Sequence, residues 1–506
     1  MSNLSELLPA GGGGKNVNFV ASGTLGNGKT VILNSDGTVT VVGESSTSVT
    51  PYISSTGTAA VANPAATDDT TIDFDSTNAN MFVIAYRDAG NSYYGACVVG
   101  TISGETITFG SESVFLSANV SYPTLKFNPN TANQFILTFA DNGSSGAATA
   151  IIGTVSGTSI SYSSKYVFNA GTTYYGTFDF DSASTDKFVV VYRDAGNSNY
   201  GTARVGTISG SSISYGAESV FNASMTNSPA VSFDPNTANK CTIVYQDGGN
   251  SNKGTAVVGT VSSTSISFGA ESTFTVATGY WQSIAYDPSV ADKFMVAFGD
   301  SGTSYHGSGV AATISGTTIT FGSTVIFNSA TTYEGDMAYD TTLTNAFAIT
   351  YQSRGNDDGV VIGGSTSGTV ISYGAKTVFL TGSGAGNGVG YEKLAFSSAG
   401  SKFVIGYKNY ANSSYGTAIV GTLTNTANVT NLTSTNFLGI TDAAISSGAS
   451  GSVTIKGGLK SELSSLTPNS IYYVQSDGSV TTASTAPAVR IGKALSSTTL
   501  NLEFNS

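Results

Sequence analysis

The sequence repeats a unit of about 53 residues, and this repetition limits the folds open to the chain more than any other feature. An aromatic residue that ends an apolar run recurs at seven places, with five successive spacings of 53 residues and a last spacing of 56. The seven positions are Tyr86, Phe139, Tyr192, Tyr245, Phe298, Tyr351 and Tyr407. Repetition at such a period predicts radial or solenoid architecture.

Each unit contains four strand-like runs that alternate in polarity and are separated by short turns. In the third unit we expect strands over 176–181, 188–194, 201–208 and 212–221. Four short strands per unit are typical of a propeller blade. Only 10% of the residues are charged, while Tyr and Phe number 26 each, and this balance suits a β-rich core. We therefore predict an all-β fold, a seven-bladed β-propeller.

A propeller protects its edge strands when the ring closes, and the sequence indicates how this chain closes. Residues 54–63 align without a gap on residues 213–222, with Ser, Gly, Val and Asn at matching places. The seventh unit loses its strand pattern after Leu423. We expect the N-terminal strand to complete the last blade.

The chain divides into four predicted segments. Residues 1–14 are expected to form a flexible attachment arm because four successive glycines follow its short apolar run. Residues 15–50 are predicted as a β-meander, 51–425 as the propeller and 426–506 as a C-terminal β module. The run LNSDGTVT at 33–40 is echoed by VQSDGSVT at 474–481, so the two flanking segments are expected to form one base domain.

Charge and motif content exclude several classes of function. The net charge is −12 and no basic run is present, so we expect neither nucleic acid nor an anionic membrane as a partner. The start of the sequence lacks the features of a signal peptide, and we expect synthesis in a cytoplasm without export by that route. Cys97 and Cys241 lie in different repeats and are expected to be unpaired. We predict no cofactor, no metal site and no catalytic residues, because phosphate-loop, nucleophile and Cys/His motifs are missing.

Turn residues recur at two places in each unit. Asp88, Asp194 and Asp300 stand in Asp-x-Gly-x-Ser turns that resemble the Asp box of sialidase-type propellers, a structural hairpin. The first strand of each unit ends in a second set that we interpret as turn caps. That set is Asp75, Asn128, Asp181, Asp234, Asp287, Asp340 and Ser397. A calcium site built from these residues is a weaker hypothesis, because residues one per blade are far apart.

Aromatic and polar residues are expected to gather on one face of the propeller. They follow the second strand of a unit or precede the first, and propeller topology brings those two places together. Sugar rings stack on aromatic side chains while their hydroxyl groups bond to polar neighbours, so the pattern favours carbohydrate binding. We interpret the lone histidine as an exposed loop residue rather than a catalytic base. The candidate residues are Tyr94, Tyr200, Lys253, Tyr280, Trp281, His306, Tyr333 and Tyr415.

The flanking segments resemble tail-fibre and receptor-binding structural proteins of tailed, especially marine, bacteriophages. The resemblance rests on LSELLPAGGGGKNVNFVASGTLGNGKTVILNSDGTV at the start and on AISSGASGSVTIKGG, LTPNSIYYVQSDGSV and IGKALSSTTLNLEF near the end. It implies a virion protein assembled in the host cytoplasm, with other virion proteins as partners through the arm and base module. It implies attachment to host cell-surface polysaccharide or lipopolysaccharide, with homo-oligomer formation left open. A capsid or tail decoration protein without a ligand and a polysaccharide-degrading enzyme remain alternatives.

Overall fold

The computed structural model describes residues 15–503 apart from 183, 185, 385, 386 and 485–487, and it divides the chain into two compact units. Unit 1 combines Met1–Val49 with Thr426–Ser506, and unit 2 is Thr50–Asn425. The predicted arm, 1–14, lies outside the described residues. Within those residues no helix has the length and apolar character needed to cross a bilayer.

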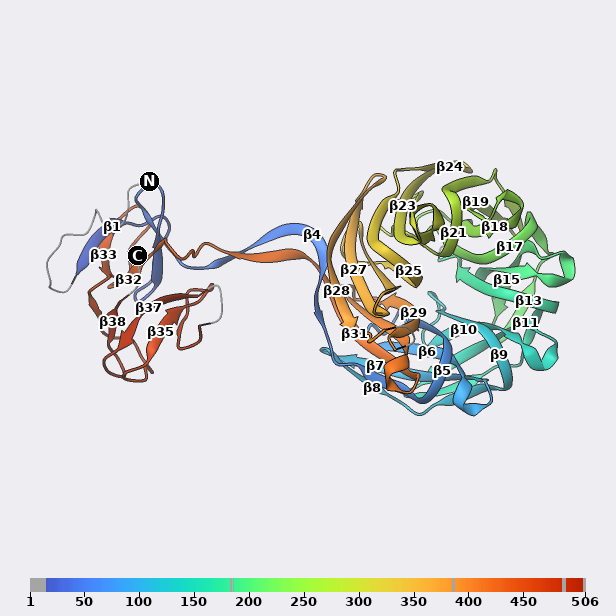
Figure 1. The fold of residues 1–506 in the computed structure, drawn as a ribbon, viewed down its shortest axis with the longest axis horizontal. Coiled ribbons are helices and arrows are strands. Elements are labelled where there is room, and N and C mark those ends of the chain that lie inside the picture. Colours follow the sequence, from blue (N-terminus) through green and yellow to red (C-terminus); the bar gives the residue numbers. More distant parts are fainter. Residues whose placement is uncertain (1–14, 183, 185, 385–386, 485–487, 504–506) are drawn as a thin grey trace. The chain divides into compact units, whose positions relative to one another are not determined.

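Unit 2 is all-β, and its repeats contain the same succession of strands (Figure 1). A long strand leads into a middle strand, a one-turn 3-10 helix follows in most repeats, and a third and a short fourth strand complete the set. The long strands are β5 (Ala60–Phe74), β9 (Ser113–Phe127), β13 (Tyr166–Phe180), β17 (Ser219–Phe233), β21 (Ser272–Tyr286) and β25 (Val325–Tyr339). In the last repeat two separate strands, β28 (Val370–Leu380) and β29 (Val389–Phe396), replace the long strand.

The remaining strands of unit 2 pair antiparallel in chain order. The middle strands are β6 (Met81–Asp88), β10 (Gln134–Asp141), β14 (Lys187–Asp194), β18 (Lys240–Asp247), β22 (Lys293–Asp300), β26 (Ala346–Ser353) and β30 (Lys402–Asn409). The third strands are β7 (Tyr94–Ser103), β11 (Ala147–Ser156), β15 (Tyr200–Ser209), β19 (Lys253–Ser262), β23 (His306–Ser315), β27 (Asp358–Ser367) and β31 (Tyr415–Thr430). The short strands are β8 (Thr106–Phe109), β12 (Ser159–Tyr162), β16 (Ser212–Tyr215), β20 (Ser265–Phe268) and β24 (Thr318–Phe321).

The long strands correct the expected strand boundaries. The fourth strand predicted over 212–221 is divided into β16 and the first part of β17. That first part pairs with β15, and the second part of β17 pairs with β18 in the next repeat. The strand changes partner between Met225 and Thr226 without a turn, and a bulge lies just inside the second part, where the register shifts between Asn227 and Ala230. One strand therefore belongs to two neighbouring repeats.

The N-terminal part of unit 2 pairs with its last repeat. β31 and β5 are antiparallel, with Gly416 opposite Asn63 and Thr417 opposite Val61. The third repeat uses the same register, with Gly201 opposite Asn222. The expected loss of strand structure after Leu423 is wrong, because β31 continues to Thr430 beside β4 (Glu44–Thr56).

Glycine in the third strand gives the apolar core of each repeat room for an aromatic ring. A Cβ on Gly206 would lie 2.2 Å from Cζ of Phe188, and a Cβ on Gly100 would lie 2.2 Å from Cζ of Phe82. Only a residue without a side chain permits this approach. Cys97 and Cys241 are buried and unpaired, as predicted.

Unit 1 interleaves the two ends of the described chain. Its first sheet has the order β1-β33-β32-β2-β3, and its second has the order β34-β38-β37-β35-β36. The N-terminal segment is therefore not the predicted meander, because β1 pairs with β33 and β2 pairs with β32 as well as β3. The strands are β1 (Asn16–Val20), β2 (Thr30–Leu33), β3 (Val39–Val41), β32 (Phe437–Thr441), β33 (Ser450–Ile455), β34 (Leu459–Lys460), β35 (Ile471–Val474), β36 (Val480–Thr481), β37 (Val489–Ala494) and β38 (Leu500–Leu502).

Candidate functional site

Unit 2 has two distinct faces, and we name them by the turns that form them. The η face contains the 3-10 turns that follow the middle strands, together with the bulges of the long strands beside them. The Asx face contains the turns that follow the inner halves of the long strands. The 3-10 turns are η2 (Ala89–Asn91), η3 (Asn142–Ser144), η4 (Ala195–Asn197), η5 (Gly248–Asn250), η6 (Ser301–Thr303) and η7 (Tyr410–Asn412).

The repeated Asp residues of the η face are structural, as predicted. Oδ1 of Asp88 accepts a hydrogen bond from Gly90 N at 3.0 Å, and Asp194 accepts one from Gly196 N at 2.9 Å. Asp300 caps η6 in the same way. All three side chains are buried, so their carboxylates serve the turn rather than a ligand.

The turn caps of the Asx face are also confirmed. Oδ1 of Asp234 accepts from Asn236 N at 2.9 Å, and Oδ2 accepts from Asp292 N at 2.8 Å in the next repeat. Asp340 likewise accepts from Thr342 N and, through its other oxygen, from Ser401 N. These two carboxylates thus close their own turns and join two repeats. Among the residues that the structure describes, no cluster of three or more His, Cys, Asp or Glu side chains is arranged to hold a metal ion.

A cavity of about 650 Å³ lies among the inner halves of the long strands and β29. Its rim on the η face is formed by one bulge residue per repeat, and each of these residues has a positive φ despite not being glycine. Such backbone is costly for a side-chain-bearing residue and is concentrated at functional sites. The rim residues are Asp69, Tyr122, Tyr175, Ser228, Trp281, Glu334 and Tyr391.

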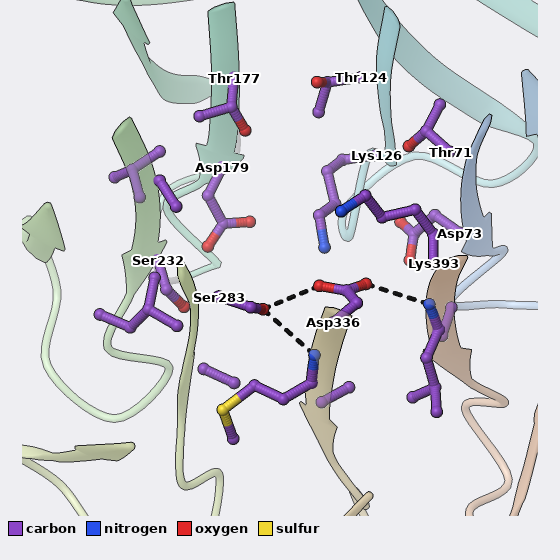
Figure 2. A pocket seen from close by; sticks show the side chains of 18 of the residues that line it. Thr71, Asp73, Thr124, Lys126, Thr177, Asp179, Ser232, Ser283, Asp336 and Lys393 are labelled. Carbon is purple, nitrogen blue, oxygen red and sulfur yellow. Dashed lines mark hydrogen bonds between the residues drawn. The ribbon is translucent and has the colours of Figure 1, made fainter. Parts of the chain in front are cut away.

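Charged side chains from several repeats meet inside the cavity (Figure 2). Asp73, Lys126 and Asp179 come from equivalent places in three successive repeats. Asp336 and Lys393 come from places two residues nearer the rim in the last two repeats. The carboxylates and both ammonium groups are directed toward the same space.

Backbone amides engage part of each carboxylate. Phe127 N donates to Oδ2 of Asp73 at 2.7 Å, and Phe233 N donates to Oδ2 of Asp179 at 2.8 Å. Asp336 uses both oxygens, one for Ser283 Oγ at 2.8 Å and one for a backbone amide. These bonds satisfy inner-strand amides that have no strand partner on the cavity side, which is a structural role.

Burial governs the protonation of these groups. It raises the pKa of Asp73 and Asp179, against the lowering effects of Lys126 and the backbone amides. Burial also disfavours the Lys126 ammonium, but the surrounding carboxylates outweigh that effect and raise its pKa. Lys126 therefore stays charged in the cavity.

Glu392 lies beside the rim and is completely buried. Neither carboxyl oxygen has a hydrogen-bond partner among the described residues. Burial raises its pKa well above the usual range, and Glu334 adds to the shift. At the equivalent place in another repeat, Gln282 Nε2 donates to the Ser228 carbonyl at 3.2 Å, which indicates that this position calls for a donor.

The four most exposed aromatic side chains of the described residues all lie on the η face. Tyr93, Tyr280, Tyr305 and Tyr333 are 40%, 40%, 38% and 41% exposed. The rings of Tyr280 and Tyr305 are 5.0 Å apart, and a hydrogen bond between them raises the pKa of Tyr280. The Arg354 guanidinium lies 4.3 Å from the Tyr333 ring. Two of these four tyrosines, Tyr280 and Tyr333, are predicted site residues.

The other predicted residues occupy separate places around the ring of repeats. Five of them are half-buried and begin a third strand. Each pairs with the Asp or Asn that caps the preceding turn. His306 is one of these, so the expectation of an exposed loop residue is wrong; its Nδ1 is buried without a partner among the described residues. Trp281 lines the cavity and donates from Nε1 to the Thr332 carbonyl at 3.2 Å. The five are Tyr94, Tyr200, Lys253, His306 and Tyr415.

Apart from Trp281, sequence reasoning missed the residues that line the cavity, and it missed two of the exposed tyrosines, Tyr93 and Tyr305. A signal for the cavity was present, because Asp73, Lys126 and Asp179 follow one another at the repeat spacing. These charged side chains interrupt a strand whose flanking positions are apolar. A charge at a fixed place in several repeats indicates a shared environment at the centre of the ring.

Comparison with known proteins supports the fold class. No model of a known protein family matches the chain, and no curated protein matches it in sequence. Among solved structures, the BP39L lectin from Burkholderia pseudomallei is similar over 73% of this chain and 98% of its own, with a TM-score of 0.52 and 10% identity. Sqt1 from Chaetomium thermophilum covers 73% of this chain and 100% of its own at 10% identity, with a TM-score of 0.45. The β-propeller domain of the trilobed protease from Pyrococcus furiosus covers 68% and 91% at 9% identity, with a TM-score of 0.40. The chain thus has an all-β, propeller-like fold.

Proposed function

We propose that unit 2 is a seven-bladed β-propeller that binds carbohydrate on its η face. Seven repeats, with four strand segments in nearly every one, and the pairing of β31 with β5 support the blade count. We further propose that the chain is a virion attachment protein of a tail-fibre type, as the resemblance of its flanking segments implies. In this proposal unit 1 and the N-terminal arm join it to other virion proteins.

The cluster of Tyr280, Tyr305 and Tyr333 on the η face carries the proposal of carbohydrate binding. Exposed aromatic rings are unfavourable in water, so a group of them on one face indicates a partner. Rings already held by a neighbour lose little conformational freedom when a sugar stacks on them. Arg354 holds Tyr333, and Arg87 lies 4.1 Å from the ring of Tyr93 in the same manner. A lectin, BP39L, has a similar fold, so the fold is compatible with this use.

The proposed activity is attachment and not cleavage. Asp88, Asp194 and Asp300 are committed to turn caps, and Asp73 and Asp179 each hold a backbone amide. Weak binding at one molecule is sufficient when many copies act together on a particle, because linked sites raise the overall affinity.

The test is binding of the full chain to a glycan array and to cells of the host. We expect saturable binding to a surface polysaccharide that falls when Tyr280 and Tyr333 are both replaced by alanine. The matched control is Val290→Ala, because Val290 is 40% exposed in a turn of the Asx face. Absence of binding to any glycan or host surface contradicts the proposal. Shortening of the polysaccharide during incubation contradicts attachment without cleavage, and immunogold labelling of particles tests the virion assignment.

A further inference from the structure

The axial cavity departs from the symmetry of the repeats that form it. Four residues after the bulge, one group of repeats carries charged side chains and the other carries small ones. Asp73, Lys126 and Asp179 form the charged wall, and Figure 2 shows them directed toward the cavity. The remaining positions are Ser232, Ala285, Ala338 and Ala395.

The charged wall offers both acceptors and donors that are not committed to the protein. Asp73 and Asp179 each accept a backbone amide of the next repeat at Oδ2, and both carboxylates are directed into the cavity. Lys126 and Lys393 form no hydrogen bond or ion pair with any residue that the structure describes. Two ammonium groups and two carboxylate oxygens in one enclosed space call for a ligand that both donates and accepts.

The small-residue wall decides which ligand chemistry fits. Alanine methyl groups offer an apolar surface and leave the space that larger side chains would fill. A sugar ring presents hydroxyl groups at its edge and C–H groups on its face, so it matches a polar wall opposite an apolar one. Asp73, Asp179 and Asp336 face two ammonium groups, and Asp69, Glu334 and Glu392 add further carboxyl groups to the lining. The cavity therefore has no excess of positive charge, which disfavours an acidic sugar.

We infer that the axial cavity binds the neutral terminal sugar residue of a glycan chain. The inner strands lie next to one another around the cavity, so a chain enters along the axis by its end. Asp73, Lys126 and Asp179 bond to its hydroxyl groups, and the alanine wall contacts its C–H face. This inference rests on the proposed carbohydrate binding and adds a second site to the η face.

Trp281 provides a direct reporter, because it is the single tryptophan of the chain and lines this cavity. The full chain is titrated with neutral di- and trisaccharides that differ in their terminal residue, with sialyllactose and oligogalacturonate as acidic probes and chitosan trisaccharide as a cationic probe. We expect at least one neutral saccharide to change the fluorescence saturably, while the acidic and cationic probes do not. Saturable binding of charged probes alone, or of no probe, overturns the inference.

Two variants locate the site. Lys126→Met removes the ammonium at nearly constant length, and Ala338→Phe fills the apolar side of the cavity. We expect each variant to weaken the saccharide affinity, measured by the fluorescence titration, about tenfold or more. Lys187→Met is the control, because Lys187 begins β14 and does not line the cavity. Circular dichroism checks that the variants are folded, and Lys126→Met keeps the test valid if Ala338→Phe fails to fold.

The two proposals fail in different ways. An unchanged fluorescence response in both cavity variants overturns the axial site, whereas glycan-array binding that depends on Tyr280 and Tyr333 leaves the η face intact. A saccharide response at Trp281 with no array binding has the opposite meaning: it supports the cavity and contradicts host attachment through the η face.

Discussion

The two faces of unit 2 come from the same repeat, but they differ in what the repeat keeps constant. On the Asx face, six of the seven inner strands end in Asp or Asn, and these residues form the same caps again and again. On the η face, the bulge residue at the cavity rim takes acidic, aromatic and hydroxyl side chains in turn. The residues that recur on the Asx face stabilise the turns and join the repeats, whereas the residues that vary on the η face are available to contact a ligand.

The Asx face is expected to give the largest loss of stability. Asp234 is fully buried and accepts two backbone amides from successive repeats. Asp234→Ala leaves both amides without an acceptor, so we expect the free energy of unfolding to fall by about 2–4 kcal/mol. Urea unfolding measures the change.

The matched comparison for this variant lies on the other face. Tyr333→Ala removes an exposed ring, and we expect its unfolding free energy to stay within about 1 kcal/mol of the parent. Asp234→Asn retains one acceptor and is expected to fall between the two. Equal stability of Asp234→Ala and the parent chain would show that the repeated caps do not hold the ring.

Replacement of Glu392 is expected to raise the free energy of unfolding, by a smaller amount that depends on pH. Its pKa in the folded chain is raised above the unfolded value, so folding is favoured below the unfolded pKa and that advantage is lost as pH rises through the folded pKa. Glu392→Gln supplies the donor that Gln282 uses, and we expect it to raise the unfolding free energy at pH 8 by about 1–3 kcal/mol.

Thermal or urea unfolding between pH 5 and pH 8 tests this expectation. The parent chain gains stability toward pH 5, and Glu392→Gln flattens that part of the curve. Glu105→Gln is the control, because it removes one carboxylate at an exposed position. A pH profile identical in the parent and Glu392→Gln contradicts the assignment of a neutral, buried carboxyl.

The η face is expected to affect binding while leaving stability nearly unchanged. Replacement of both Tyr280 and Tyr333 by alanine removes the stacking surface, and we expect glycan affinity to fall about tenfold or more. Surface plasmon resonance on the host polysaccharide measures the loss. A double variant that binds as tightly as the parent moves the binding site away from these tyrosines.

Local chemistry made much of the fold predictable from the sequence. The repeat period and the capping Asp residues are visible because turns need particular residues at fixed places. The bulge of each long strand is not visible, since Asp69, Tyr122 and Trp281 adopt positive φ without glycine to signal it. The division of the fourth strand and the sharing of the long strand were also missed, because they depend on which strands pair and not on a local residue pattern.

The cavity was hidden for a related reason. Which residues of an inner strand face the axis depends on the parity set by the bulge, and a shift of one residue exchanges the two sides of a strand. Two of the four exposed tyrosines were predicted, because propeller topology places aromatic residues beside these turns on one face. The sequence predicted that the two flanking segments form one domain, as unit 1 does. It missed the strand pairing inside unit 1, because β1 pairs with β33, more than 400 residues away, and no local pattern encodes such a partner.

The smallest expected effect extends the comparison to unit 1, where the Asp-Gly turn is itself repeated. Oδ1 of Asp36 accepts from the Thr38 hydroxyl at 2.7 Å and from Thr38 N at 3.0 Å, and these bonds lower the pKa of Asp36. Asp477 is held by Ser479 in the equivalent hairpin, with the same direction of shift. The contribution of each cap is present above the unfolded pKa and is lost as pH falls through the lowered folded pKa.

Carboxyl titration by NMR separates the two hairpins. Thr38→Val removes the hydroxyl donor, so we expect the pKa of Asp36 to rise while that of Asp477 stays unchanged. Ser479→Ala is the reciprocal variant and should move Asp477 alone. If either variant shifts both carboxyls, the two turns are coupled through unit 1, and the view that each repeated cap acts within its own turn is wrong there.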